Sequence, residues 1–445
     1  MELKPGSMRA HERAWAVAFR QDAALLDAIA HVAGGPFHII NPESFADNLR
    51  AFSKVLRDRR VPGRVYFGKK ANKAGAWMRE AARQGGSVDV ASEPEFAHAL
   101  ANGVRGTDIG VTGAAKSNDL LWLAYRHGAI VAIDALDELE RAIAVAEDGA
   151  PLRILLRVLP PKATDSRFGL NEDDLGAALR RCAGMRSHLT MEGFSFHLDG
   201  YAVEPRAELA AILVERCREV RVGLGLPCSA VSIGGGFACS YVDEDDWRAF
   251  QDQADPALFH AGKRFDRFYP YHQSPTGAAM LDAILRTQDR GETLATRMIA
   301  ADVQLYAEPG RALLDGAGMS VFPVQGFKRN DEHGIVTVAG LSMSLSEQWK
   351  NSEFLPSPIL VQRGPERPQV PIRAAIGGSS CMEYDVLTWR KVSFPAEPRS
   401  GDLMIYVNTA GYQMDKNESE FHQLSLPPKI VVSRRDQQFT WRIDQ

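Results

Sequence analysis

The sequence predicts an α/β protein: a (β/α)8 TIM barrel followed by a mostly β C-terminal domain. Between residues 64 and 310, short β-rich runs alternate with amphipathic, alanine-rich stretches, and this unit occurs eight times. Eight strand–helix units are what such a barrel requires. The last third of the chain instead has β-like runs separated by Pro and Gly. A length of 445 residues accommodates both domains.

The expected barrel strands are short runs rich in β-branched and aromatic residues. They lie at 65–67, 87–90, 109–111, 130–133, 154–158, 193–196, 230–233 and 303–307. The intervening stretches, such as 93–102 and 206–224, have the apolar periodicity of helices that pack on a sheet.

The expected strands of the second domain lie at 336–339, 359–362, 371–375, 402–407 and 429–433. Residues 36–40 precede the first barrel strand and are predicted to join this domain from the N-terminal side. We therefore expect three parts: a segment 1–41 that joins the β domain, a barrel at 42–310, and a β domain at 311–445. We expect the β domain to contribute to the active site and to a dimer.

A long interruption at 237–297 separates the seventh and eighth barrel strands, and it contains the aromatic cluster 265–271. Insertions of this length at the catalytic end of a barrel commonly form a lid or a partner contact. A surface excursion that packs on its own aromatic residues is an equally good interpretation, so both remain open here.

Composition excludes several classes of protein. The formal net charge is -4 and no block of basic residues occurs, so we expect no nucleic-acid partner. No apolar run approaches membrane-spanning length, and residues 1–9 lack the apolar core of a signal peptide. The five cysteines form no CxxC pair. These features predict a cytoplasmic protein with reduced cysteines and no metal site.

Chemically useful residues follow the expected strands. In a barrel the C-terminal ends of the strands meet on one face, where active sites are found. Each of these residues alone is more often structural, and their shared position at strand ends carries the prediction. They are Lys69, Lys70, Asp89, Arg157, His197, Gly234, Gly235, Gly236, Glu308 and Arg311.

These residue types suit one cofactor, pyridoxal 5'-phosphate. A lysine amine forms a Schiff base with an aldehyde. A triple-glycine turn brings backbone N–H groups close to a phosphate, and Arg311 adds a charge-assisted clamp. Glu308 facing the pyridine nitrogen would favour the protonated ring, and His197 would stack on that ring.

The chain resembles the fold-type III pyridoxal-phosphate decarboxylases, the group of diaminopimelate, ornithine and arginine decarboxylases with an alanine-racemase-like barrel. The matching segments occur in family order over roughly residues 36 to 433. They are 70–72, 88–92, Arg157 with 166–169, 196–197, 234–237, 308–311, Cys381 with Asp385, and 411–412. The segment 408–412 and the length of the insertion also resemble decarboxylases of siderophore and other secondary-metabolite pathways.

The resemblance implies a role for each matching residue. Lys70 would bind the cofactor covalently, His197 would stack on its ring, and Glu308 would pair with its pyridine nitrogen. Asp89 and Arg157 would support this region, and Cys381 would protonate the carbanion left after loss of carbon dioxide. The phosphate would be held by Gly235, Gly236, Arg311 and Tyr412.

The resemblance also implies a homodimer, in which Cys381 and Asp385 reach the site of the other subunit. We choose Lys70 over Lys69 because adjacent strand residues point to opposite faces and the family's Ala-Asn pair directly follows the lysine. Lys69 is then expected to be a neighbouring charge that lowers the pKa of Lys70.

Two departures from the family pattern bear on ligands. Met382 follows Cys381, where the family has an acidic residue that binds the distal amine of a diamino acid. A thioether cannot stabilise a buried ammonium group, and burying that charge without a partner would cost on the order of several kcal/mol. Glu383, the next residue, would substitute for that acidic residue in binding the substrate if its side chain took a different orientation, and Asp385 is expected to contact the substrate as well. Gly200 stands where the family has a serine whose hydroxyl would contact the phosphate.

The function expected is decarboxylation at the α-carbon of an amino acid or an amino-acid conjugate other than a standard diamino acid. Such an enzyme is a carboxy-lyase of amino-acid metabolism. One alternative is an amino-acid racemase or epimerase on the same fold, although Cys381 favours decarboxylation because a racemase needs bases on opposite faces. Another is a catalytically silent regulatory homologue, against which the retention of Lys70, Glu308 and Arg311 argues.

Overall fold

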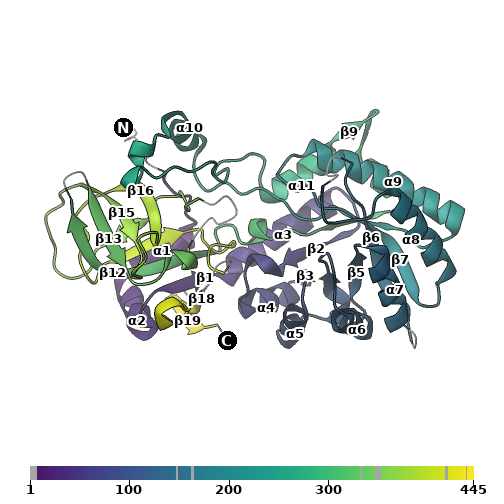
Figure 1. Cartoon of the computed structure of the whole chain (residues 1–445), viewed down its shortest axis with the longest axis horizontal. Coiled ribbons are helices and arrows are strands. Elements are labelled where there is room, and N and C mark those ends of the chain that lie inside the picture. Colours follow the sequence, from purple (N-terminus) through teal and green to yellow (C-terminus); the bar gives the residue numbers. More distant parts are fainter. Residues whose placement is uncertain are drawn as a thin grey trace.

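The structure is a computed structural model that describes residues 8–146, 149–161, 165–330, 333–345, 352–415, 419–436 and 438–444. Two lobes lie side by side, a barrel with its helices and a β-rich lobe that includes the first and last elements of the described chain (Figure 1). Among the described residues, no helix is both long and apolar enough to cross a membrane.

The barrel is closed and every neighbouring pair of its strands is parallel, in the order β11-β2-β3-β4-β5-β6-β7-β8. The fold class expected from the sequence is confirmed, and each expected barrel strand overlaps an observed one. The strands are β2 (Gly63–Gly68), β3 (Ser87–Val90), β4 (Ile109–Val111), β5 (Ile130–Ile133), β6 (Leu152–Arg157), β7 (Leu189–Ser195), β8 (Ala230–Ser232) and β11 (Gln304–Ala307).

Helices cover the outside of the barrel and pair with their neighbours in sequence. Most begin with a side-chain cap, such as Ser92 for α5 and Asn171 for α8, which satisfies backbone N–H groups of the first turn. The helices are α3 (Pro42–Asp58), α4 (Gly75–Arg83), α5 (Glu93–Ala101), α6 (Asn118–His127), α7 (Leu136–Val145), α8 (Glu172–Gly184), α9 (Glu204–Leu224), α11 (Gly277–Arg286) and α12 (Leu294–Ala300).

The barrel interior is filled by side chains rather than open. Tyr66 and Tyr306 pack edge to face with ring centroids 5.5 Å apart, and Ile130 and Leu155 complete this layer. A side chain at Gly110 would meet the Tyr66 ring at 3.2 Å, so glycine makes room for that ring. The layer forms a packed floor beneath the C-terminal ends of the strands.

The second lobe is built on one sheet that includes a strand from the N-terminal segment. The strand β1 (Phe37–Ile40) pairs antiparallel with β12 and parallel with β18, as the sequence predicted for residues 36–40. The other strands are β12 (Gly318–Arg329), β13 (Gly334–Val338), β14 (Ile359–Val361), β15 (Ile372–Gly377), β16 (Val386–Phe394), β17 (Leu403–Val407), β18 (Lys429–Arg435) and β19 (Gln438–Ile443). Beside this sheet lie α1 (Ala14–Gln21) and α2 (Ala23–Ala33).

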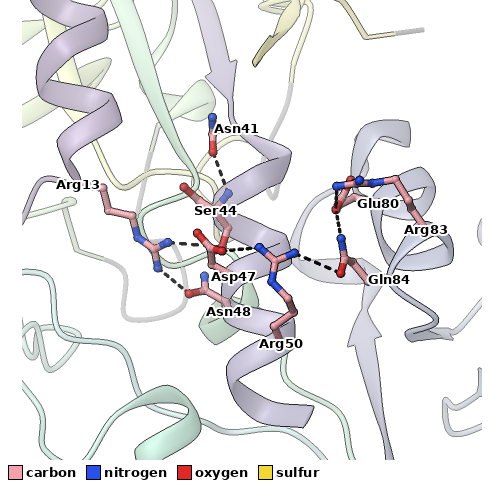
Figure 2. Close-up of polar contacts among 9 residues, drawn as sticks. All are labelled: Arg13, Asn41, Ser44, Asp47, Asn48, Arg50, Glu80, Arg83 and Gln84. Atoms are coloured by element: carbon pink, nitrogen blue, oxygen red, sulfur yellow. Dashed lines mark hydrogen bonds and ion pairs between the residues drawn. The ribbon is translucent and has the colours of Figure 1, made fainter. Parts of the chain in front are cut away.

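The junction between the lobes is fixed at the start of α3, directly after β1 (Figure 2). Asn41 caps this helix, because its Oδ1 accepts a hydrogen bond from the Ser44 N–H over 2.8 Å. Arg13 donates to the Asn48 side chain over 2.5 Å, and Asn48 in turn donates to the carbonyl groups of residues 313 and 315. The chain therefore leaves the β lobe and enters the barrel through a hydrogen-bonded corner.

The interruption at 237–297 has two different parts. Its end belongs to the barrel, because α11 packs on α3 and α12 packs on α9. Its beginning carries α10 (Glu244–Gln253) and runs between the two lobes (Figure 1). There Tyr271 donates a hydrogen bond to the carbonyl of Glu353 over 3.1 Å, and Phe259 forms a β-bridge with Arg390. The segment also packs on its own aromatic residues, because Phe250 and Phe259 both contact Phe268, so the interpretation as a surface excursion describes only part of its packing.

Candidate active site

A cavity of about 500 Å³ opens at the C-terminal ends of the barrel strands. Seven of the residues singled out from the sequence line it: Lys70, His197, Gly235, Gly236, Glu308, Arg311 and Tyr412. The remaining lining residues are Leu198, Asp199, Gly200, Tyr201, Phe237, Arg267, Tyr269, Pro270 and Gly310. The strand ends therefore converge on one site as expected.

Lys70 lies in a short 3-10 turn (Lys69–Ala71) directly after β2, and its side chain is exposed within the cavity. Burial by itself would lower the pKa of Lys70, but Asp89, Tyr412 and Glu308 more than offset this, so the pKa is raised. The pKa of Lys70 is therefore raised and not lowered as expected, and Lys69 is not among the main groups that shift it.

Lys69 is buried and has a different set of charged neighbours, chiefly Glu95 and Asp415. Burial lowers the pKa of Lys69, and the carboxylates beside it partly restore it. The two adjacent lysines therefore serve different places: Lys70 faces the cavity, whereas Lys69 is held in the packing outside it.

Asp89 at the end of β3 is buried below the cavity, beside a small space of about 20 Å³ that Glu308 also lines. Burial, together with the nearby Glu308 carboxylate, raises the pKa of Asp89 to about 8, against the opposing effect of Lys70. Within the described residues, Asp89 Oδ1 is buried without a hydrogen-bond partner. Such an atom at the floor of a cavity marks a functional position.

Glu308 follows β11, and one oxygen of its carboxylate is held by a hydrogen bond. The Ser232 hydroxyl, at the end of β8, donates a hydrogen bond to Glu308 Oε1 over 2.6 Å. Ser232 is fully buried, so this contact sets the orientation of the carboxylate at the cavity. The sequence did not single out Ser232, because a serine at a strand end has no distinctive pattern.

The triple-glycine turn after β8 is shaped by close neighbours. A Cβ at Gly234 would lie 2.6 Å from the Phe196 carbonyl oxygen, and one at Gly236 would lie 2.2 Å from the Arg206 guanidinium. Gly234 and Gly236 also have positive φ angles of 65° and 79°. Only glycine fits these positions, and Gly235 and Gly236 bring the backbone of the turn to the cavity wall.

His197 packs against this turn in its neutral form. Burial and the nearby cations Lys70 and Arg157 lower the pKa of His197 to about 3. Its Nδ1 accepts a hydrogen bond of 3.3 Å from the Gly235 N–H. That N–H is therefore engaged, and the phosphate contact expected of Gly235 would require it to turn away from the ring.

Arg311 is enclosed by tyrosines. Its guanidinium lies 4.3 Å from the centre of the Tyr269 ring and 4.9 Å from that of Tyr412, within the range of a cation–π contact. Its Nη1 donates to the Tyr241 hydroxyl over 3.0 Å and more weakly to the Gly411 carbonyl over 3.4 Å. Two of these tyrosines, Tyr241 and Tyr269, come from the insertion.

Arg157 lies behind the cavity wall rather than in it. Its Nη1 donates to Asp134 Oδ1 over 3.2 Å, and its guanidinium stacks 4.3 Å over the Phe168 ring. Its charge opposes the rise in the pKa of Lys70 and adds to the effect of burial and Lys70 that lowers the pKa of His197.

The loop from Gly378 to Asp385, between β15 and β16, lies apart from this cavity. None of its residues lines the space around Lys70 of the same chain, although all of them are described. Cys381, Met382 and Glu383 are exposed on its outer side. Asp385 is buried, and its carboxylate accepts hydrogen bonds from the Ser342 and Ser380 N–H groups over 2.7 and 3.0 Å. In this structure Asp385 holds the loop together, so a direct substrate contact remains a prediction.

The comparisons with known proteins agree with this site. The model of the family described as "Pyridoxal-dependent decarboxylase, pyridoxal binding domain" matches residues 43–269, half of the chain. A protein of Sinorhizobium fredii named "Uncharacterized protein y4yA" is 35% identical over 404 residues, which cover 90% of this chain and 88% of the relative. The chain belongs to the pyridoxal-dependent decarboxylases.

Other members of this decarboxylase family are more distant in sequence. A diaminopimelate decarboxylase of Actinosynnema pretiosum is 27% identical over 90% of this chain and 84% of the relative. Two solved structures share the fold. They are diaminopimelate decarboxylase of Helicobacter pylori in complex with L-lysine (TM-score 0.71, 16% identity, 92% and 93% of the two chains covered) and the arginine decarboxylase of Paramecium bursaria Chlorella virus bound to agmatine (0.69, 18%, 92% and 99%).

The cofactor of these decarboxylases is pyridoxal phosphate, and the cavity fits it. The matched region is the family's pyridoxal-binding domain. The cavity presents the Lys70 amine, the Glu308 carboxylate, the Arg311 guanidinium and the backbone of a glycine turn. The unpartnered Asp89 oxygen lies at its floor. An aldehyde, a basic ring nitrogen and a phosphate each find a suitable group there.

Proposed function

We propose that the protein removes the α-carboxylate of an amino acid or an amino-acid conjugate, and that its substrate is not a standard diamino acid. The family membership and the lysine-bearing cavity support the reaction class. The observation that carries the substrate proposal is Met382, next to the exposed Cys381.

The residues around the cavity divide the work of holding the cofactor. Lys70 would bind its aldehyde carbon, and Gly236, Arg311 and Tyr412, with Gly234 and Gly235 shaping the turn, would hold its phosphate. When bound, the protonated ring withdraws the electron pair that the departing carbon dioxide leaves behind. Glu308, fixed by Ser232, would keep the ring nitrogen protonated.

The neutral His197 can cover the face of the ring without placing a second cation against it. Burial and Glu308 raise the pKa of Asp89, so its carboxyl can hold a proton near the Lys70 amine. Arg157 stays paired with Asp134 behind the cavity wall, where its positive charge is offset by that carboxylate. These residues orient the cofactor and manage protons near Lys70 Nζ.

Cys381 would return a proton to the product carbon. Because the loop that carries it lies apart from the cavity of its own chain, we infer a homodimer in which this loop completes the site of the partner subunit. Its exposed apolar neighbours Met382 and Tyr384, 40% and 77% exposed, are suited to be covered by a second copy.

Met382 supports a substrate without a distal ammonium group. The diaminopimelate decarboxylases among the relatives act on a diamino acid by their names. An ammonium group placed against a thioether gains no ion pair, and its burial costs on the order of several kcal/mol. Glu383 is exposed one residue further on, so its carboxylate is the alternative partner that the experiment below must test.

The test is a screen of amino acids and their conjugates for release of carbon dioxide by the cofactor-loaded protein. We expect release from a mono-amino substrate and little or none from diaminopimelate, lysine or ornithine. The chirality of remaining substrate, followed in the same incubation, separates decarboxylation from racemisation. Lys70→Ala is the control, because it retains the fold but lacks the reactive amine. Efficient turnover of a diamino acid would contradict the substrate proposal.

A further inference from the structure

A phosphate bound near the glycine turn would bring more negative charge than Arg311 can neutralise. Among the lining residues, the cations are Lys70, Arg267 and Arg311, and the anions are Asp199 and Glu308. Lys70 and Glu308 follow the neighbouring strands β2 and β11 and serve the aldehyde and the ring. A phosphate monoester brings about -1.5 to -2 charges near pH 7, and Asp199 on the same wall adds another negative charge. Arg311 alone does not balance this charge.

Arg311 also has part of its hydrogen-bonding capacity already in use. Its Nη1 donates to Tyr241 and to the Gly411 carbonyl, and its flat faces lie against Tyr269 and Tyr412. These contacts fix the orientation of the guanidinium. A fixed orientation suits a single contact with an anion. They leave fewer N–H groups for a three-oxygen phosphate.

The strip of wall beside the glycine turn, residues 198–201, offers no free donor side chain. Gly200 has no side chain, and the Tyr201 hydroxyl is hydrogen-bonded to the Tyr269 hydroxyl over 2.8 Å. Arg206 lies behind this strip, buried, and donates to the carbonyl oxygens of Leu198, Gly200 and Ala202. Its charge therefore holds the backbone of the strip and does not face the cavity.

Arg267 of the insertion is the remaining cation among the residues that line the cavity. It is two residues before Tyr269, which packs on Arg311, and its side chain is exposed at the cavity. Within the part of the chain that the structure describes, no carboxylate forms an ion pair with it and no hydrogen bond engages its guanidinium. A guanidinium presents several donors in a planar fork that matches a phosphate.

We propose that Arg267 binds the phosphate of pyridoxal phosphate together with Arg311, so that the insertion supplies part of the cofactor site. The inference rests on the cofactor assignment within the proposed function and is independent of the substrate. It gives the insertion a role that neither its length nor its aromatic content explains: Tyr241 and Tyr269 position one arginine, and Arg267 adds the second.

The experiment compares cofactor affinities of the full-length protein after removal of the bound cofactor. Wild type and Arg267→Ala are titrated with pyridoxal phosphate and, separately, with pyridoxal, which has the same aldehyde but no phosphate. We expect Arg267→Ala to raise the Kd for pyridoxal phosphate about 10- to 100-fold and to leave that for pyridoxal unchanged, because only charge-assisted contacts to phosphate are lost. Arg267→Lys should recover part of the affinity.

Arg264→Ala is the matched control, because Arg264 is exposed on the same segment but does not line the cavity. Its affinities should equal those of wild type, and thermal unfolding should show that all variants are folded. An equal loss for both ligands, or no loss for either, would overturn the proposal. An unchanged Kd for pyridoxal phosphate with a raised KM for a carboxylate-bearing substrate would overturn it too, because Arg267 would then bind the substrate anion.

Failure of the proposed function leaves a different pattern of results. If the screen finds no carbon dioxide release but Arg267→Ala still weakens the binding of pyridoxal phosphate selectively, the reaction assigned here is wrong and the phosphate contact stands.

Discussion

The thiol of Cys381 lies 3.3 Å from His422 Nε2, and the same ring nitrogen is 3.4 Å from the Cys381 backbone N–H. His422 has a positive φ of 59°, a strained backbone conformation for a histidine. Both side chains come from loops of the β lobe, and Cys381 is exposed. The imidazole is therefore placed to orient the thiol and to exchange its proton.

Cys381→Ala is expected to impair product protonation and to leave the cofactor bound. Loss of a positioned general acid lowers turnover about 10²- to 10⁴-fold. The measurement pairs carbon dioxide release with the yield of the expected amine, while the visible absorption band reports the cofactor. Cys182→Ala, at a buried helix position, is the control and should keep normal turnover. If the absorption band disappeared in Cys381→Ala, the role in proton transfer would be refuted.

His422→Ala should lower turnover less than Cys381→Ala and should shift the pH dependence of kcat. The reason is that the thiol remains but loses the base that accepts or restores its proton. His422→Gln keeps a hydrogen-bonding side chain but has no imidazole base, so it should restore the orientation of the thiol without restoring the pH profile. A profile identical to wild type in His422→Ala would show that the contact is only structural.

Reduction of the cofactor-loaded protein with borohydride should attach the cofactor to Lys70. Lys70 is exposed in the cavity and is influenced by the charges of Asp89 and Glu308, whereas Lys69 is buried near Glu95 and Asp415. Peptide mass spectrometry reads out the site directly. In Lys69→Met the cofactor should still be found on Lys70. Recovery of the cofactor on Lys69 of the wild type would disprove the assignment.

Much of the barrel could be predicted from sequence, because parallel strands are buried on both faces and therefore appear as short apolar runs. The missed strands lack that pattern for physical reasons. The strand β12 contains Pro323 and bulges at Gly326, and β16 has Arg390 and Lys391 in its middle. The strand β19 alternates exposed and half-buried residues at the edge of its sheet, so no apolar run marks it.

The residues of the site also fall into those that the sequence could predict and those that it could not. Strand-end residues such as Lys70 and Glu308 were predictable because the barrel brings strand ends together whatever the loops do. Tyr241, Tyr269 and Arg267 were not, since their place depends on how a long insertion crosses from one lobe to the other. Only the aromatic content of residues 265–271 pointed to that segment, and it did not indicate which side chains face the cavity.

Asp89→Asn should flatten the pH dependence of stability of the cofactor-free protein. The unfolded carboxyl ionises near 3.8, whereas burial and Glu308 raise the folded pKa of Asp89 to about 8. Between these values the folded protein holds a proton that the unfolded chain releases, so stability falls as pH rises. Thermal unfolding from about pH 5 to 8 should show a smaller decline in the variant.

Asp282→Asn serves as the comparison for that experiment. Its hydrogen bond with Arg59 lowers the pKa of Asp282, so any stability it contributes is lost as pH falls below its unfolded pKa. The profile between about pH 5 and 8 should therefore keep the wild-type slope. Parallel profiles for wild type and Asp89→Asn would contradict the raised pKa of Asp89.

Met382→Glu should extend the substrate range toward diamino acids. A carboxylate next to Cys381 supplies the ion pair that the thioether cannot, worth on the order of several kcal/mol for a buried ammonium. We expect kcat/KM for lysine or diaminopimelate to rise and that for the native substrate to fall. Glu383→Gln tests the neighbouring carboxylate: if it alone abolished a diamino activity of the wild type, Glu383 rather than position 382 would select the substrate.

Lys116→Met should destabilise the barrel far more than the loss of a surface ion pair. Lys116 Nζ lies 2.9 Å from Glu138 Oε2 with both side chains buried, and Glu138 also accepts the Asp134 N–H over 2.8 Å. Removing the cation leaves that carboxylate uncompensated at a cost of about 3 kcal/mol, the lower end for a buried pair because backbone donors remain. Lys54→Met breaks an exposed pair with Asp58 and should cost less than about 1 kcal/mol. Denaturant unfolding of both variants measures the difference, and equal losses would show that burial does not set the strength of the Lys116 pair.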